Sequence, residues 1–155
     1  MRSTVRHAAL KRAERRHRLE TRHYAQLAEF RYALRRFLRF SEGAAAKVGL
    51  TGQHYQAMLV LRACPDGKRP SINELAAQLL IKHNSAVGLV DRLVAERLVA
   101  RDTSSADRRK VELSLTARGA TLLGKLAAAH RQELQHLGPV LTRFFADFVR
   151  SGPEP

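Results

Sequence analysis

Two strand-like runs, close together in the chain, constrain its fold more than any other feature. They comprise residues 98–103 and 110–115, and in the second run Val111 and Leu113 alternate with polar side chains. The segment between them, "SSAD" at 104–107, consists of residues that favour turns. Since no other run in the chain is strand-like, the sequence predicts one two-stranded hairpin in an otherwise helical protein.

Two short helices are predicted just before this hairpin. Ser71 precedes Glu74 by three residues, the spacing of a capping box, and the helix that starts there is expected to end near Leu80. After a short break a second helix runs to about Arg97, and its apolar stripe comprises Ala86, Val90, Leu93 and Val94. Two short helices in such close succession predict a helix-turn-helix, and a hairpin directly after it forms a wing.

Longer helices flank this motif. Apolar residues recur at three- and four-residue steps over 22–47, and Thr51 offers an N-cap for a helix that stops before the loop at 64–70. Beyond the hairpin, Thr116 caps a long helix, which we expect to break at 138–139, where Pro139 opens a last helix. The predicted fold class is therefore mainly α with a small β-hairpin wing.

The charge of the chain indicates the class of its partner. Its 28 Lys and Arg against 14 Asp and Glu leave a formal charge of +14, which implies a polyanion, with nucleic acid ahead of an anionic membrane surface. No window approaches the length of a membrane-spanning apolar run. Residues 1–22 alone hold eight Lys and Arg against two Glu, and form either a DNA-contacting arm or a solvated tail.

Other features narrow the compartment and the chemistry. Cys64 is the only cysteine and the N-terminus has no apolar stretch of signal-peptide length, so we expect a cytoplasmic protein, although the Arg-rich start could mimic a transit peptide. The chain contains no GxSxG, HExxH, GxxxxGK[ST] or GxGxxG motif, which disfavours an enzyme, and we expect no cofactor. His130, Glu133 and His136 lack zinc-ligand spacing and are expected to be solvated.

In this order of elements the chain resembles the MarR family of winged helix-turn-helix transcription regulators. The resemblance covers roughly residues 24–150. It is most specific in three segments, "ELAAQL" at 74–79, "SAVGLVDRLVAERLVAR" at 85–101 and "ADRRKVELSLTARG" at 106–119. It implies a homodimeric regulator, most often a repressor, that binds a palindromic operator in double-stranded DNA and is released by a small-molecule effector. The alternative is a nonspecific architectural protein that binds DNA or RNA through the same charge.

The resemblance also implies how the chain is organised. After the arm at 1–22, residues 23–155 would form a single domain, with the winged helix-turn-helix at about 51–116 and dimerisation helices at about 23–48 and 117–150. The terminal helices hold more aromatic side chains than one small motif can cover, which favours a dimer interface, with intrachain core as the alternative. These side chains are Phe30, Phe37, Phe144, Phe145 and Phe148.

The apolar stripe of the second short helix should face the core and leave Lys82, His83, Asn84, Ser85 and Gly88 on or near the exposed N-terminal face. This end of a recognition helix points into the major groove. Asn84 can pair with an adenine edge and Ser85 with a base or a phosphate, whereas His83 and Lys82 can donate to guanine or phosphate oxygens. The alternative is that Asn84 or Ser85 merely caps the helix.

Two positions here depart from the family's pattern. Gly88 stands where many members carry an arginine, and Leu80 replaces the glycine often found in the turn of the motif. Gly88 removes one long side chain from base readout, and its small size can let the helix approach the DNA backbone closely. The operator sequence therefore does not carry over from the family.

The tip of the predicted wing is basic. Arg108, Arg109 and Lys110 can reach the sugar-phosphate backbone and the minor groove while the helix occupies the major groove. The resemblance makes Asp107 the residue that orients the wing arginine. The alternative is a solvated charged turn that keeps an edge strand from pairing.

Two further arginines are candidates for phosphate contacts. Arg92 lies on the second short helix, and Arg101 lies on the first strand of the wing. Either can instead form a structural ion pair with Asp91 or Asp102.

Many family members respond to small phenolic or aromatic anions bound between the dimer helices and the winged motif. The resemblance therefore suggests a cationic, aromatic-lined cleft, with plain core as the alternative for the tyrosine; the candidates are Arg31, Arg35, His54 and Tyr55. A redox-sensing regulator is another alternative, in which Arg62 would activate the Cys64 thiol, although an inert, partly buried thiol is favoured.

Overall fold

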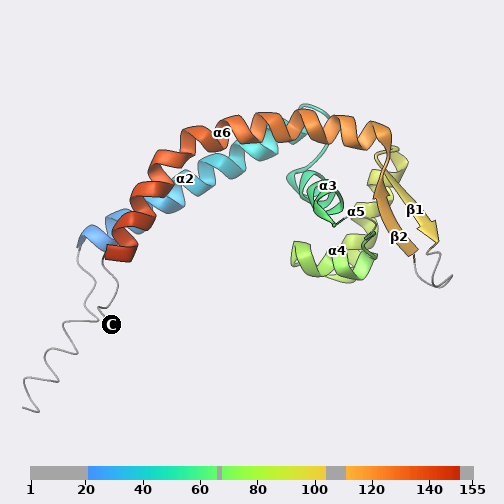
Figure 1. The fold of residues 1–155 in the computed structure, drawn as a ribbon, viewed down its shortest axis with the longest axis horizontal. Helices are drawn as coiled ribbons and strands as arrows, with labels where there is room; N and C mark the ends of the chain where they lie inside the picture. Colours follow the sequence, from blue (N-terminus) through green and yellow to red (C-terminus); the bar gives the residue numbers. More distant parts are fainter. Residues whose placement is uncertain (1–20, 66–67, 104–110, 151–155) are drawn as a thin grey trace, which may run out of the picture. The chain divides into compact units, whose positions relative to one another are not determined.

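The computed structural model describes residues 21–65, 68–103 and 111–150 (Figure 1). In chain order the elements are α2 (Thr21–Ala46), α3 (Gly52–Ala63), α4 (Ile72–Leu79), α5 (His83–Ala95), β1 (Val99–Thr103), β2 (Val111–Leu115) and α6 (Ala117–Arg150). The order of helices and hairpin predicted from the sequence is confirmed except for the separate last helix, and the fold is a winged helix-turn-helix with long flanking helices. None of the described helices is long and apolar enough to cross a membrane.

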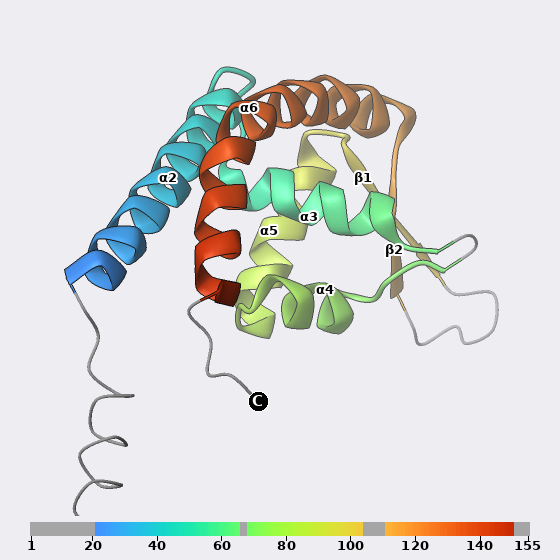
Figure 2. The ribbon, with the colours of Figure 1, turned by 60° about the vertical axis from the view of Figure 1, so that its left-hand side comes forward.

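The chain divides into two compact units. The larger unit comprises residues 38–133 and holds α3, α4, α5 and the hairpin, together with the end of α2 and the beginning of α6. The smaller unit contains the described parts of residues 1–37 and 134–155. Within the larger unit, α3, α4 and α5 gather in one cluster with the hairpin beside them (Figure 2).

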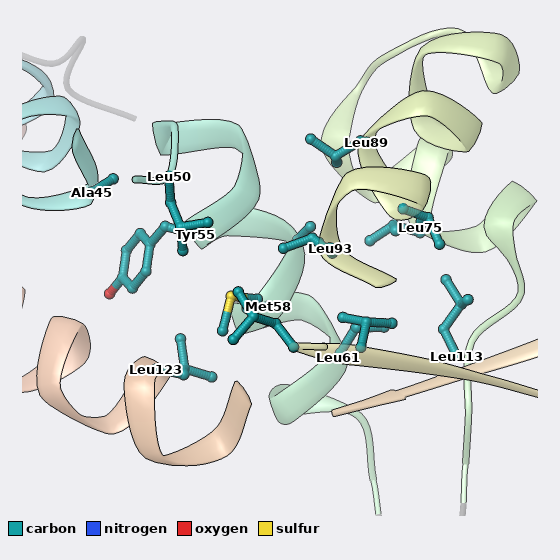
Figure 3. Packing of buried hydrophobic residues seen from close by; sticks show 14 of the residues in the cluster. Ala45, Leu50, Tyr55, Met58, Leu61, Leu75, Leu89, Leu93, Leu113 and Leu123 are labelled. Atoms are coloured by element: carbon teal, nitrogen blue, oxygen red, sulfur yellow. The ribbon is translucent and has the colours of Figure 1, made fainter. Parts of the chain in front are cut away.

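A continuous apolar core holds the larger unit together. Met58 of α3, Leu75 of α4, Leu93 of α5 and Leu113 of β2 are at most 1% exposed. Figure 3 shows Met58 among side chains that come from several of these elements, with Leu123 of α6 on the side away from Leu75 and Leu113. Complete burial of a leucine side chain stabilises a fold by roughly 1.5–3 kcal/mol. The core therefore fixes which face of α5 is turned inward.

Side chains at the helix starts fix where three helices begin. Ser71 and Glu74 form the predicted capping box, in which the Ser71 hydroxyl accepts the Glu74 N–H at 3.3 Å and the Glu74 carboxylate accepts the Ser71 N–H at 2.8 Å. Thr51 forms a second box with His54, whose Nδ1 accepts the Thr51 N–H at 3.1 Å in place of the usual Glu or Gln oxygen. The Thr116 hydroxyl accepts an N–H of the first turn of α6, as predicted.

The hairpin is anchored on both sides. β1 and β2 pair in antiparallel register along their whole length, and the Leu113 N–H donates to the Pro70 carbonyl just before α4. At the start of α6, a Cβ on Gly119 would overlap the carbonyl oxygen of Leu98, so only glycine fits there without a shift of the backbone. The wing is thus tied to the motif at its base.

The predicted break at 138–139 is wrong. α6 continues from Ala117 through Pro139 to Arg150 as one helix. A proline in a helix interior removes one hydrogen bond to the carbonyl four residues earlier, here that of Gln135, but the turns on either side keep their own bonds. The boundary between the two units lies in the same helix, after Glu133, two residues before the Gln135 carbonyl.

His130 is also not solvated as expected, because its side chain is 4% exposed. Its Nδ1 lies 2.7 Å from the Leu126 carbonyl oxygen and its Nε2 lies 2.8 Å from the Ser41 hydroxyl. Since a carbonyl oxygen only accepts, Nδ1 donates to Leu126, and Nε2 shares a hydrogen bond with the Ser41 hydroxyl. The ring stacks on Tyr55 at a centroid distance of 4.0 Å. Within the larger unit His130 therefore joins α6, α2 and α3.

Candidate nucleic-acid interface

The first turn of α5 presents four polar side chains to solvent. Lys82 is the N-cap residue, and its side chain makes no capping hydrogen bond. His83, Asn84 and Ser85 occupy the first three helical positions, and all four residues, which we call the recognition turn, are exposed. The alternative that Asn84 or Ser85 caps the helix is wrong, since neither occupies the N-cap. The side chains of both are thus available for other contacts.

The opposite face of α5 is buried and sets the orientation of this turn. Ala86, Val90 and Leu93 are buried as predicted, and Leu89, which the predicted stripe does not include, is also only 7% exposed. These residues pack in the core with α3 and α4. Because the buried side chains recur at three and four residue steps, the recognition turn is held away from the core.

The exposed face continues along α5 from the recognition turn. Asn84, Gly88 and Arg92 follow each other at four-residue steps, so they lie along one side of the helix, and all three are exposed. A Cβ at Gly88 would meet no atom within 4 Å, so the fold does not require glycine there. The first turn of α5 contains no acidic residue, and the free N–H groups of a helix N-terminus attract anions. This face suits a phosphate-rich surface.

Arg101 and the base of the wing are held by ion pairs. The Arg101 guanidinium donates to Asp91 on α5 at 2.7 Å. The Asp102 carboxylate instead accepts from Arg69, also at 2.7 Å, and from the Ser114 hydroxyl at 3.2 Å. Of the two ion pairs that the sequence left open for Arg101, the structure has the one with Asp91. Arg69 was not found from the sequence, because its partner lies 33 residues away.

The predicted wing tip and arm lie outside the described residues. The tip comprises Asp107, Arg108, Arg109 and Lys110, and the arm comprises residues 1–22, of which 1–20 fall outside. Their assignment to DNA stays a prediction.

The four candidate effector residues fall in both units. Arg31 and Arg35 are exposed on the part of α2 that belongs to the smaller unit, whereas His54 and Tyr55 are 6% and 5% exposed in the core of the larger unit. Tyr55 stacks on His130, and burial raises the pKa of its hydroxyl. The position of Tyr55 thus agrees with the alternative that its side chain is part of the core.

His54 is buried, and in the part of the chain that the structure describes only one of its two ring nitrogens takes part in a hydrogen bond. Its Nδ1 accepts from Thr51, so the proton of the neutral ring is on Nε2, and in the described part of the chain Nε2 has no hydrogen-bond partner. Burial lowers the pKa of His54, and the Arg92 guanidinium lowers it further, while Glu96 opposes both. The neutral form of His54 is therefore the one that fits the cap of α3.

The smaller unit contains an aromatic cluster and exposed apolar side chains. Phe30 of α2 stacks on Phe144 of α6 at a centroid distance of 4.5 Å, and Phe145 packs edge-on against both rings. Phe37 is half-buried, and Phe148 lies outside the side chains that the structure describes. A second set of residues on α2, which we call the outer apolar stripe, is 41–59% exposed and comprises Tyr24, Leu27 and Leu34.

Cys64 lies at the end of α3 and is partly buried. Its thiol donates to the Val60 carbonyl at 3.4 Å, and it lines a cavity of about 330 Å³ together with residues of α4. Among the residues that the structure describes, no three His, Cys, Asp or Glu side chains come together as metal ligands.

Comparisons with known proteins agree with this architecture. Residues 48–110 match the model of the MarR family. No curated protein matches the sequence significantly. Among solved structures, the transcriptional repressor CouR bound to a 23-mer DNA duplex is 29% identical, with 79% of this chain and 84% of that chain covered and a TM-score of 0.61.

Two further solved structures have the same fold. BpsR of Bordetella bronchiseptica, described with the regulation of its DNA binding by 6-hydroxynicotinic acid, is 26% identical over 70% of this chain and 80% of its own, with a TM-score of 0.56. AbsC of Streptomyces coelicolor, a MarR family transcriptional regulator, is 20% identical over 87% of this chain and 99% of its own, with a TM-score of 0.67. The chain thus has the winged helix-turn-helix fold of MarR family transcriptional regulators, and its residues 48–110 are similar to that family in sequence.

Proposed function

We propose that this protein is a sequence-specific regulator that binds double-stranded DNA as a homodimer. The observation that carries the proposal is the recognition turn, residues 82–85, which is exposed, lacks acidic residues and is held outward by the buried face of α5. A helix end of this kind enters the major groove in helix-turn-helix proteins. The similar repressor CouR is described as bound to a DNA duplex.

The residues of this face divide between base reading and phosphate binding. Asn84 has the donor and acceptor pair that matches an adenine edge, and Ser85 can contact a base or a phosphate. Lys82 and His83 donate to phosphate or guanine oxygens, and Arg92, which has no acidic partner among the described ion pairs, binds phosphate further along the helix. Arg101 contributes through the Asp91 pair, which holds the wing against α5.

The wing tip adds affinity more than specificity. Arg108, Arg109 and Lys110, oriented by Asp107, approach the backbone and the minor groove, where arginine responds to groove width. Replacement of Arg109 by alanine should weaken binding to all sequences and flatten the dependence of affinity on salt. An unchanged salt slope would remove Arg109 from the interface.

Dimerisation is assigned to the smaller unit. Its aromatic residues pack mainly on each other, but the outer apolar stripe and Phe145, which is 53% exposed, leave apolar surface uncovered. A second copy of the chain would cover it and would place two recognition turns on the two halves of a palindrome. The remaining candidates for the interface are Phe30, Phe37, Phe144 and Phe148.

The regulation proposed is repression in the cytoplasm, released by a small aromatic or phenolic anion. BpsR is described as regulated by 6-hydroxynicotinic acid, an aromatic acid. The candidate residues for such an effector are Arg31 and Arg35, which are exposed cations on α2, and His54 and Tyr55, whose rings belong to the larger unit. Because both rings are buried, their contribution requires a change in the packing around α3 when the effector binds.

One experiment tests the DNA-binding proposal. The purified protein is used to select genomic fragments, and the enriched palindrome then competes with random duplex at physiological salt. We expect the palindrome to bind at least 1,000-fold more tightly, roughly the lower limit for specific regulators. Equal affinity for both would show a nonspecific architectural protein instead.

The salt dependence of binding provides a second test of the DNA-binding proposal. Removal of one cation that neutralises a phosphate should reduce the slope of log affinity against log salt by about 0.9, so Arg92→Ala should flatten it. The matched control is Lys47→Ala, which removes the same charge from an exposed position outside the winged motif. If the control flattens the slope as much as Arg92→Ala does, the effect is one of net charge and Arg92 does not bind phosphate.

A further inference from the structure

Leu80 occupies an energetically unfavourable position in the turn between α4 and α5. It is the C-cap residue of α4, and its backbone is left-handed, with φ of 54° and ψ of 39°. A residue with a Cβ avoids this conformation, whereas glycine adopts it readily. The Leu80 side chain is also 92% exposed, the highest value among the large apolar residues that the structure describes. The position thus combines backbone strain with an apolar side chain in water.

The fold itself does not account for a leucine here. The turn needs a left-handed residue whose N–H donates to the carbonyls of Ala76 and Ala77, and glycine or asparagine would meet that need at lower cost. With its side chain almost wholly exposed, Leu80 adds little to the core. Of the described residues other than glycine, only Arg97 shares a positive φ, and it carries a charge that water solvates.

The surroundings of Leu80 indicate what covers it. It lies three residues before α5 begins, next to the recognition turn, where Lys82 and His83 are exposed. A lysine cation and an imidazole beside an apolar group match a surface that combines phosphates with an apolar patch. In the major groove the main apolar group on the base edges is the 5-methyl group of thymine.

We propose that Leu80 packs against the methyl group of a thymine in each half-site and so determines specificity at that base pair. This inference rests on the proposed DNA binding through α5. Contact with the methyl group removes the leucine surface from water in the complex, which compensates for the exposure and strain of the free protein. Leucine thus replaces a less costly glycine because it reads a base.

The test uses operators in which each thymine is replaced in turn by uracil, which lacks only the methyl group. For the wild-type protein, one symmetric position should weaken binding by about fourfold for each half-site changed, which is the effect of one buried methyl group. Leu80→Gly and Leu80→Asn, which accept the left-handed turn, should bind the thymine and uracil operators equally. Leu80→Met, which keeps an apolar side chain, should retain the discrimination.

Stability measurements separate this role from a structural one. Leu80→Gly should fold with a Tm at least as high as that of the wild type, because it removes the strain. Arg97→Gly is the control that relieves the same strain elsewhere, and it should leave the thymine preference unchanged. A lower Tm for Leu80→Gly would indicate a packing role and overturn the inference.

The outcomes distinguish this inference from the proposed function. If the wild type selects no DNA, the proposed function fails and this inference fails with it. If the wild type selects an operator but uracil affects Leu80→Gly as much as the wild type, only the role of Leu80 is wrong. A loss of affinity in Leu80→Gly that is equal for thymine and uracil operators would assign Leu80 to a sugar contact and overturn the proposal.

Discussion

The recognition turn and the outer apolar stripe are both exposed, but they differ in chemistry. The recognition turn presents Lys82, His83, Asn84 and Ser85, all polar or cationic, above a face that is fully buried. The outer apolar stripe presents Tyr24, Leu27 and Leu34 to water. The first surface is stable in the free protein and suits a charged partner, whereas the second gains free energy only when an apolar surface covers it. Exposure alone therefore does not identify a partner, but the chemistry of the exposed groups does.

The largest expected effect comes from a charge placed in the outer apolar stripe. Leu27→Lys should prevent dimerisation and weaken operator binding by roughly 100-fold or more, because a single recognition turn would bind one half-site alone. Analytical ultracentrifugation and binding titrations measure the two effects. The matched control is Ala25→Lys at an exposed position of α2 outside the stripe, which should remain dimeric. A dimeric Leu27→Lys protein would mean that the stripe is not the interface.

A change in the recognition turn should reduce base discrimination without affecting dimerisation. Asn84→Ala should leave the dimer intact and cost about 1–3 kcal/mol of discrimination at one base position in each half-site. Binding to a set of operators with single base changes measures this loss. A uniform loss across all sequences would assign Asn84 to a phosphate instead of a base.

Acid pH should destabilise the larger unit through His54, which is buried in its interior. The folded-state pKa of His54 is lowered, so its contribution to stability is present above its unfolded pKa and is lost as pH falls through the folded value. Protonation places an N–H on Nδ1 against the Thr51 N–H and removes part of the cap of α3, which is worth about 1 kcal/mol.

His54→Asn is the control for this prediction, because its side-chain oxygen can accept the same N–H without titrating. Urea unfolding at a series of pH values should show a steeper loss of stability at acid pH in the wild type than in His54→Asn. Parallel curves for the two proteins would contradict the prediction.

The smallest effect concerns Gly88. Gly88→Ala should stabilise the free protein by about 0.5–1 kcal/mol, since the site is exposed, helical and open to a Cβ. If operator binding weakens despite this gain, glycine is needed for close approach to DNA; if binding is unchanged, it is not. Thermal unfolding and a binding titration measure the two quantities.

Local patterns predicted the elements of this fold well. Thr51, Ser71 and Thr116 were identified as caps from spacing within one turn, and each forms its cap in the structure. The hairpin followed from alternation over 110–115. Local reasoning was wrong about the helix break at Pro139, where one missing hydrogen bond does not end a helix whose neighbouring turns remain intact.

The sequence by itself determined the order of helices and strands, the positive charge and the resemblance to the MarR family, because these depend on residue type and short-range spacing. Only the tertiary structure decided that His130 is buried against Ser41, 89 residues away, that Arg101 pairs with Asp91, and that Leu80 is left uncovered. Periodicity indicates which side of a helix is apolar, but the burial of a single side chain depends on what the rest of the chain brings to it.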